Sequence, residues 1–300
     1  MRQLESSGGQ IVNARRLTGA IVLAGLVLAS CGSSSKSSSN TPPTTVAPAA
    51  IPQVTIEAKD FSYQMPAQIP AGWVDVTLHN SGKQGHQIAF VKLGSMTFAQ
   101  FKARIATTDI KNLPAGTVFV GGPNNVEPGT SVTATVKLDP GAYAVACLIP
   151  AADGKPHAAH GMIAQVNVVQ TAQSVSTEPT TTAGEIDLSE FTFVPSANFT
   201  GKGVVQFKNV GTQVHEAILV KLNPGKTLAE AKAFFLSQNP SGPPPFTSAG
   251  GIVGLGPQQV NYQTMALTPG HYVLLCFFPD PNKGNIPHAL EGMIKEITVN

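Results

Sequence analysis

The sequence predicts an all-β protein built from β-sandwiches, and two observations carry this prediction. Glycine (29) and proline (24) are frequent among the 300 residues, while only 12% of the residues are charged. Such a composition suits short strands and many turns better than long surface helices. Between the turns, short stretches are rich in β-branched residues or alternate in polarity, as at residues 74–78, 132–138 and 143–148. We therefore expect a sandwich of two sheets as the folding unit.

One segment in each half of the chain departs from this strand pattern. Residues 97–106 and 227–236 space their apolar side chains at helical intervals, and each segment begins with a threonine. Threonine is a good helix N-cap because its side-chain oxygen accepts a hydrogen bond from the first turn. We expect one short helical insertion in each half.

The chain contains one domain twice, at residues 51–170 and 185–300. A length of 300 residues suits two ordinary domains. Equivalent residues keep a constant spacing, which indicates duplication rather than chance similarity. The spacing is 129 positions for two pairs and 131, after a two-residue insertion, for two more: His86 with His215, Cys147 with Cys276, His157 with His288, and Met162 with Met293.

The N-terminal segment is expected to direct export. Two arginines precede the apolar residues 17–30, a stretch too short to span a bilayer stably but typical of a signal peptide. It ends in Leu-Ala-Ser-Cys, which resembles the bacterial lipobox. We predict that residues 1–31 are a lipoprotein signal peptide with Cys31 as the lipidated residue. A plain membrane anchor with a chance cysteine is the alternative.

Two stretches are predicted to connect the folded parts. Residues 32–50 are mostly Ser, Thr, Pro and Ala, which predicts a disordered tether, and residues 171–184 have a similar composition and predict a linker between the domains. The chain would then lie at the extracytoplasmic face of the cell membrane, held there by its N-terminal lipid. With 19 basic and 17 acidic residues and a net charge of +2, nucleic acid is not an expected partner.

Each half carries a set of side chains that suits copper. A histidine lies about sixty residues before the single cysteine, and a histidine and a methionine follow the cysteine closely. Two imidazoles and a thiolate, with a weakly held thioether, form the ligand set of an electron-transfer copper site. Thiolate and thioether favour Cu(I), and imidazole suits Cu(II). The candidate ligands are His86, Cys147, His157 and Met162 in the first half and His215, Cys276, His288 and Met293 in the second.

Three motifs that occur in both halves resemble the cupredoxins, the plastocyanin and azurin family. They are an Asn-x-Gly turn before the first histidine, a Pro-Gly-x-Tyr turn leading into the cysteine, and Pro-His followed by Gly-Met. They stand at residues 80–82, 140–143 and 156–162, and again at residues 209–211, 269–272 and 287–293. The resemblance implies two tandem cupredoxin-like Greek-key β-sandwich domains with copper as cofactor. It also implies equatorial histidine and cysteine ligands, with Met162 and Met293 axial.

One feature departs from the blue copper pattern. Nine residues separate Cys147 from His157, and eleven separate Cys276 from His288, where the family has only a few. These insertions, residues 148–156 and 277–287, contain Asp, Gly, Lys and Pro and predict an extended hairpin or loop. Such a loop either returns the histidine to the metal or is too mobile to impose the ligand geometry of a blue copper site.

Other polar residues near the motifs are expected to play lesser roles. His79, His160 and His271 have no counterpart in the other half, which predicts surface or supporting positions. Gln87 and Glu216 directly follow the first histidine of each set and are candidates to support the ligands.

The sequence leaves three functions open. The first is a membrane-tethered electron carrier with a redox partner protein, and the second is a Cu(I) delivery protein with a copper donor or acceptor. The third is a metal-free interaction module, in which the two thiols are inert or form a disulfide between the halves. An enzyme is not expected, because no histidine flanks either cysteine and no nucleophile or phosphate-binding motif appears.

Overall fold

The computed structural model describes residues 50–107, 110, 112–237 and 240–300. The described residues group into one compact unit. The predicted signal peptide, the lipidation site Cys31 and nearly all of the tether lie outside the described residues. Among the residues described, no helix is both long and apolar enough to cross a bilayer.

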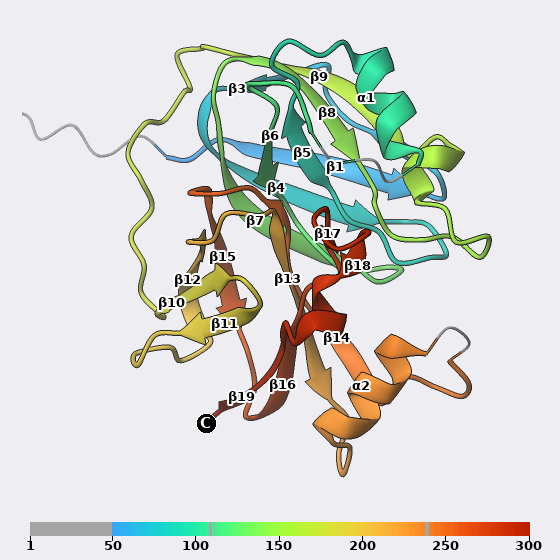
Figure 1. The fold of residues 1–300 in the computed structure, drawn as a ribbon. Helices are drawn as coiled ribbons and strands as arrows, with labels where there is room; N and C mark the ends of the chain where they lie inside the picture. Colours follow the sequence, from blue (N-terminus) through green and yellow to red (C-terminus); the bar gives the residue numbers. More distant parts are fainter. Residues whose placement is uncertain (1–49, 108–109, 111, 238–239) are drawn as a thin grey trace, which may run out of the picture. The chain divides into compact units, whose positions relative to one another are not determined.

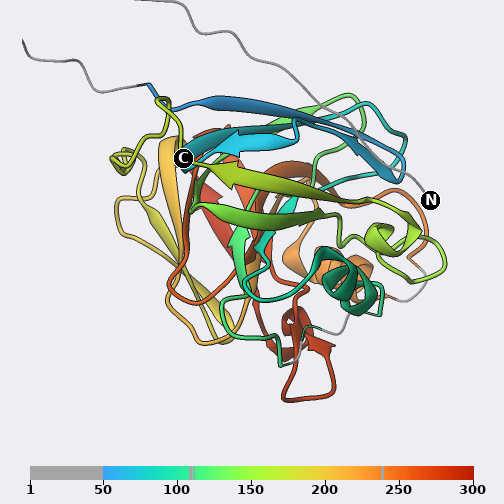
Figure 2. The ribbon, with the colours of Figure 1, turned by 90° about the horizontal axis from the view of Figure 1, so that it is seen from above.

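The first half forms two layers of strands, which Figure 2 shows as blue strands above green ones. One layer contains β1 (Gln53–Lys59), β2 (Ser62–Gln64), β4 (Gly72–Asn80) and β7 (Ser131–Leu138). The other contains β3 (Gln68–Pro70), β5 (Ala89–Lys92), β6 (Val118–Gly121), β8 (Gly141–Ala146) and β9 (Ile163–Val169). The chain crosses between the layers after β4 and again after β6 and β7, so neighbouring strands are often not consecutive, as in Greek-key sandwiches.

The second half repeats this arrangement and confirms the all-β prediction. Its first layer contains β10 (Glu185–Ser189), β11 (Thr192–Pro195), β12 (Lys202–Asn209) and β15 (Val260–Ala266). Its second layer contains β13 (His215–Leu222), β14 (Phe246–Leu255), β16 (Gly270–Leu275) and β19 (Ile294–Val299), and a separate hairpin joins β17 (Pro279–Asp280) to β18 (Ile286–Pro287). Burial alternates along strands such as β1, because every second side chain faces the core between the layers.

The two halves share both sheets. The strand order β11-β10-β12-β15-β7-β4-β1-β2 runs through one layer, and β19-β16-β13-β14-β6-β5-β8-β9-β3 runs through the other (Figure 1). At each junction a strand pairs with its own counterpart, β7 with β15 and β6 with β14, and both pairs are antiparallel. The halves are therefore related by an approximate two-fold rotation, like the subunits of a symmetric dimer.

Backbone hydrogen bonds mark where this rotation axis passes. Pro123 bridges to Ile252, which lies 129 positions further along the chain and is its equivalent in the repeat. Two hydrogen bonds flank the bridge symmetrically, from Asn124 N–H to the Gly251 carbonyl (3.1 Å) and from Val253 N–H to the Gly122 carbonyl (3.0 Å). The buried Asn261 side chain adds a third connection, since it accepts from Gly122 N–H and donates to the Val120 carbonyl.

The segment predicted as a linker packs against both halves. Trp73 of β4 donates its backbone N–H to the Val175 carbonyl (2.7 Å), and Tyr262 of β15 donates its hydroxyl to Glu178 (2.5 Å). Ala183 is fully buried. These contacts and the shared sheets restrict motion of one half against the other.

The two predicted helical insertions are confirmed as α1 (Phe98–Ile105) and α2 (Leu228–Leu236). Thr97 and Thr227 are the N-caps, and each forms a capping box with the residue three positions later. In α1, Phe101 and Ile105 lie on the same face one turn apart and are buried.

Replacing Thr97 with alanine is expected to lower the free energy of unfolding by about 1 kcal/mol, because the Gln100 backbone N–H in the first turn of α1 loses its acceptor. Urea denaturation measures the change. Lys102→Ala, at an exposed site in the same helix, serves as the control and should stay within about 0.5 kcal/mol of wild type. Equal effects of the two substitutions would contradict the capping role.

Candidate metal centres

A buried asparagine positions the first histidine of each set. The Asn80 side-chain amide donates to the carbonyls of Gln84 and Val126, both at 2.7 Å, while its oxygen accepts from Gly82 N–H. His86 then exchanges backbone hydrogen bonds with Val126. Asn209 makes the equivalent bonds to the Gln213 and Leu255 carbonyls and to Gly211 N–H. The Asn-x-Gly motif thus fixes the turn that carries the histidine.

The insertion before the second histidine is a closed hairpin in both halves. In the first half, Ala151 N–H donates to the Lys155 carbonyl at 2.7 Å. His157 N–H donates to the Ile149 carbonyl at 2.9 Å, and the residue after His157 donates to the Cys147 carbonyl. The sequence left open whether this loop returns the histidine to the metal site or is too mobile to do so. In the structure the extra residues bulge outward and the histidine returns to the cysteine.

The second half closes its longer insertion in the same way. The strands β17 and β18 pair, His288 N–H donates to the Phe278 carbonyl (2.9 Å), and Ala289 N–H donates to the Cys276 carbonyl (2.7 Å). Both histidines begin a single 3-10 turn, η1 (His157–His160) or η2 (His288–Glu291). The ligand loops are therefore held by main-chain bonds on both sides of the histidine.

These elements bring His86, Cys147 and His157 together. The Nδ1 atom of His157 lies 3.4 Å from Cys147 Sγ and 3.2 Å from His86 Nδ1. One donor atom from each residue falls within 4.8 Å of the other two, and all three residues are buried. The three lone pairs can therefore converge on one ion.

The second half builds the same cluster from His215, Cys276 and His288. His288 Nδ1 lies 3.4 Å from Cys276 Sγ and 3.1 Å from His215 Nδ1. All three residues are again buried, with their donor atoms within 4.8 Å of one another. Two nitrogens and one soft sulfur form a donor set that copper fits in both of its oxidation states.

The two methionines are fully buried next to these clusters. Cys147 N–H donates to the Met162 carbonyl (3.1 Å), and Met162 N–H donates to the His157 carbonyl (3.0 Å). Met293 makes the equivalent bonds in the second half. The backbone therefore places each methionine beside the cysteine and the second histidine, and its role as an axial ligand stays a prediction.

Sequence reasoning missed a carboxylate behind the first histidine of each cluster. Asp60 Oδ1 lies 3.0 Å from His86 Nε2, and Glu190 Oε1 lies 3.4 Å from His215 Nε2. The hydrogen bond to Asp60 holds the proton on Nε2 of His86 and leaves its Nδ1 lone pair directed at the cluster. Glu190 lies near His215 Nε2 without forming a hydrogen bond to it. The available signal was that both repeats have an acidic residue before a phenylalanine at this position.

The phenylalanines after these acids support the second histidine. The rings of Phe61 and His157 are 5.0 Å apart, and so are those of Phe191 and His288. Such contacts restrict the imidazole orientation before a metal binds.

The electrostatics of both clusters suit a metal that displaces protons. Burial lowers the pKa of the imidazoles, that of His288 to about 4, so these histidines are neutral near pH 7 and their lone pairs are available. Burial also raises the pKa of the Cys147 thiol to about 12 and that of Cys276 above its ordinary value. A metal ion must therefore release the thiol proton when it binds.

Replacing Asp60 with alanine is expected to weaken metal binding by the first cluster about tenfold, because His86 loses the group that fixes its tautomer. Competition with a chromophoric chelator measures the affinity. The second cluster keeps Glu190 and serves as an internal control, so an equal loss at both clusters would contradict the orienting role.

The residues after the first histidines differ between the halves. Glu216 is buried, its carboxylate accepts from Phe277 N–H (2.9 Å) and from the Asn124 amide (3.2 Å), and its own N–H donates to Cys276 Sγ (3.3 Å). Burial raises the pKa of the Glu216 carboxyl to about 7. Gln87, at the equivalent position, is neutral. The second cluster therefore has a buried acid where the first has an amide.

The three remaining histidines lie at the surface, and the two cysteine thiols do not pair with each other. Both cysteines are free and buried, each with its own pair of histidines, so no disulfide joins the halves among the described residues. The three other histidines are exposed and have polar partners: His79 with Ser131, His160 with Asp153, and His271 with Glu296.

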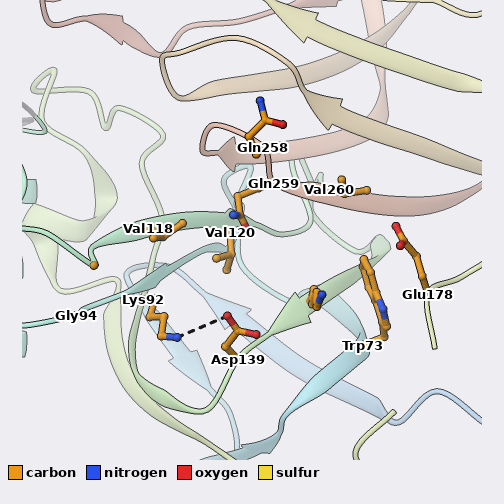
Figure 3. Close-up of a pocket in the computed structure, with 12 residues that line it drawn as sticks. Trp73, Lys92, Gly94, Val118, Val120, Asp139, Glu178, Gln258, Gln259 and Val260 are labelled. Atoms are coloured by element: carbon orange, nitrogen blue, oxygen red, sulfur yellow. Dashed lines mark ion pairs between the residues drawn. The ribbon is translucent and has the colours of Figure 1, made fainter. Parts of the chain in front are cut away.

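A cavity of about 500 Å³ lies at the junction of the halves (Figure 3). Trp73 lines it, and Lys92 forms an ion pair with Asp139 at 3.6 Å. Gln258 and Gln259 of the second half complete the side opposite these residues. No histidine or cysteine lines this cavity, which is separate from the clusters.

Comparisons with known proteins find only weak likenesses, all to solved structures. No family model matches the chain, and no curated protein matches its sequence. Among solved structures, dithionite-reduced auracyanin from Roseiflexus castenholzii is 25% identical, covering 40% of this chain and 98% of that one with a TM-score of 0.30. Auracyanin A from Chloroflexus aurantiacus, a "blue" copper protein, is 17% identical, covering 40% and 100% with a TM-score of 0.29.

One similar structure spans both halves. The copper-containing nitrite reductase from Thermus scotoductus is 14% identical, and the match covers 84% of this chain and 62% of that one with a TM-score of 0.24. These likenesses are too weak to assign the chain to a family. The copper-binding capacity rests on the two His-Cys-His clusters themselves.

Proposed function

We propose that the protein is a membrane-tethered, extracytoplasmic electron carrier with two copper sites. The observation that carries this proposal is the convergence of two imidazole nitrogens and one cysteine sulfur within 4.8 Å, in a buried position and in both halves. Bound copper would supply a one-electron couple at each cluster.

The ligand roles follow from the donors. His86, Cys147 and His157 would hold copper in the first half as equatorial ligands, with Met162 as the weak axial one. Their counterparts would do the same in the second half: His215, Cys276 and His288, with Met293 axial. The carboxylate of Asp60 would keep His86 in the tautomer that ligates through Nδ1.

The closed hairpins favour electron transfer over copper delivery. A delivery protein benefits from a mobile loop that releases its metal, whereas an electron carrier needs ligands that do not rearrange when the charge changes. In both halves, main-chain hydrogen bonds tie the second histidine and the residue after it to the cysteine and to the residue two positions after the cysteine. Cu(I) delivery remains the second candidate because the same sulfur donors hold Cu(I) well.

The location and the partners belong to this proposal as well. Lipid on Cys31 would tether the chain to the membrane, and residues 32–50 would give the folded unit reach towards a redox partner protein. The absence of histidines beside Cys147 and Cys276 supports a carrier rather than a catalyst.

Copper loading of the chain after removal of the predicted signal peptide tests the proposal. We expect two copper ions per chain, an intense visible thiolate-to-copper band and a reversible one-electron couple. Tight Cu(I) binding without a reversible couple would favour delivery instead. Failure to bind copper would leave only the metal-free interaction module.

A further inference from the structure

The two clusters differ in which histidine has a hydrogen-bond partner at its outer nitrogen, Nε2. In the first half Asp60 lies 3.0 Å from Nε2 of His86, while Nε2 of the second histidine has no partner among the described residues. In the second half it is the second histidine, His288, whose Nε2 lies 3.2 Å from Gln213 Oε1, and Nε2 of the first histidine there has no partner among those residues. The halves therefore hold opposite histidines of a repeated set.

Backbone hydrogen bonds fix Gln213 beside His288. The Gln213 N–H donates to Glu190 Oε1 at 2.8 Å, and the Gln213 carbonyl accepts from the Asn209 side chain at 2.7 Å. His288 is fully buried and Gln213 is partly buried, so the bond between their side chains is shielded from water. Glu190, which does not bond to His215, thus positions the residue that reaches the other histidine of the cluster.

A buried carboxylate stands behind the Gln213 side chain. Asp280 of β17 is 1% exposed, and its carboxylate accepts from Asn282 N–H at 2.7 Å. Burial disfavours the charged form of this carboxyl, but hydrogen bonding from Asn282 N–H and from the Gln213 side chain lowers the pKa of Asp280. An ionised carboxylate can only accept, so it faces the amide NH₂ of Gln213 and leaves the amide oxygen for His288 Nε2–H.

The first half has the glutamine but not the carboxylate. Gln84 is the equivalent of Gln213, 129 positions earlier in the repeat, and it is exposed. Ala151 occupies the position of Asp280, because each directly follows the proline that pairs across its hairpin with the proline before the second histidine. Alanine has no side-chain acceptor, so the carboxylate that faces Gln213 has no counterpart at this position.

We propose that Gln213, held by Asp280, is a positioning residue for the second copper site. Its amide oxygen accepts from His288 Nε2–H, which leaves the Nδ1 lone pair of His288 directed at the cluster, 3.4 Å from Cys276 Sγ. In the first site Asp60 does this for the other histidine. The consequence for copper rests on the proposed function, whereas the tautomer of His288 is a property of the metal-free chain.

Nitrogen-15 NMR of the imidazole rings in the metal-free protein tests this role. We expect His288 as the Nε2–H tautomer in the wild-type protein and a mixture of both tautomers in Gln213→Met, which keeps the side-chain length but lacks the amide oxygen. Gln84→Met, at the equivalent exposed position of the first half, is the matched control and should leave His288 unchanged. A wild-type His288 protonated on Nδ1, or no change in Gln213→Met, would overturn the proposal.

A double variant separates the hydrogen bond from packing. Gln213→Glu combined with Asp280→Asn exchanges the amide and the carboxylate but keeps an acceptor for His288 Nε2–H, so the wild-type tautomer should be retained. Loss of that tautomer in the double variant would show that packing, not the acceptor, orients the ring. If the variants do not fold, the tautomer of His288 in the wild-type protein still decides.

The affinity for Cu(I) connects the tautomer to the metal site. Competition with a chromophoric chelator should show about tenfold weaker binding at the second cluster in Gln213→Met and no change at the first. A changed tautomer with an unchanged affinity would overturn the positioning role. A wild-type chain that binds no copper would overturn the proposed function, while the NMR result on the metal-free protein would still decide how His288 is held.

Discussion

Replacing Cys147 with serine is expected to abolish the copper site of the first half and to leave that of the second half intact. Cys147 supplies the only thiolate in its cluster, and a hydroxyl oxygen is a poor ligand for Cu(I) and gives no thiolate-to-copper band. The copper content should fall from two ions to one, and the visible band should lose the contribution of one site.

The duplicated fold supplies the matched control for this experiment. Cys276→Ser should remove the other half of the signal, and the double variant should remove all of it. His160→Ala changes an exposed histidine in the same turn as His157 and should leave the band unchanged. Loss of both sites in one single variant would mean that the clusters are not independent.

The fold and the clusters could be predicted because their determinants are local in the sequence. Thr97 and Thr227 begin the two helices by satisfying their first amides, which depends only on the next three residues. The positions of the cluster residues follow from a repeat with constant spacing, and a duplicated donor set has few explanations other than a shared ligand. Cys147 and His157 could therefore be paired without knowledge of the loop between them.

The path of that loop could not be predicted, for a physical reason. The hairpin closes through backbone groups, such as His157 N–H on the Ile149 carbonyl, and every residue has these groups. The sequence shows turn-forming residues but not which carbonyl will accept. The carboxylate of Asp60 was missed for a related reason, since it contacts His86 from the turn after β1, 26 positions earlier in the chain.

The continuity of the sheets across the halves was also absent from the sequence. Val120 pairs with Leu255 and Val136 with Asn261, and both pairings use the backbone groups at the edge of a strand. The side chains of an edge strand do not show whether another strand will cover that edge. One consequence is functional. The rotation that joins the edges also brings Leu148 and Phe277 into one cavity wall, so the two clusters are neighbours through the residues that follow their cysteines.

Exchanging Gln87 and Glu216 is expected to move the reduction potentials of the two sites in opposite directions. Glu216 places a buried carboxyl beside the second cluster, and burial raises its pKa to about 7, so the negative form gains population as the pH rises above 7. A nearby negative charge stabilises Cu(II) over Cu(I), so the second site should have the lower potential in the wild-type protein. At an effective dielectric constant of about 20, a unit charge several ångströms away contributes on the order of 2 kcal/mol. For one electron this energy corresponds to roughly 80 mV.

The single variants separate this charge effect from a change in packing. Glu216→Gln should raise only the potential of the second site, because Gln has nearly the same shape and keeps an acceptor for Phe277 N–H. Gln87→Glu should lower only that of the first site. Potentiometry at pH 8, with each site examined in the background of the other cysteine replaced by serine, gives the two values separately. Shifts of the same sign in both variants would show that packing around the sulfur, rather than the charge at this position, sets the difference between the halves.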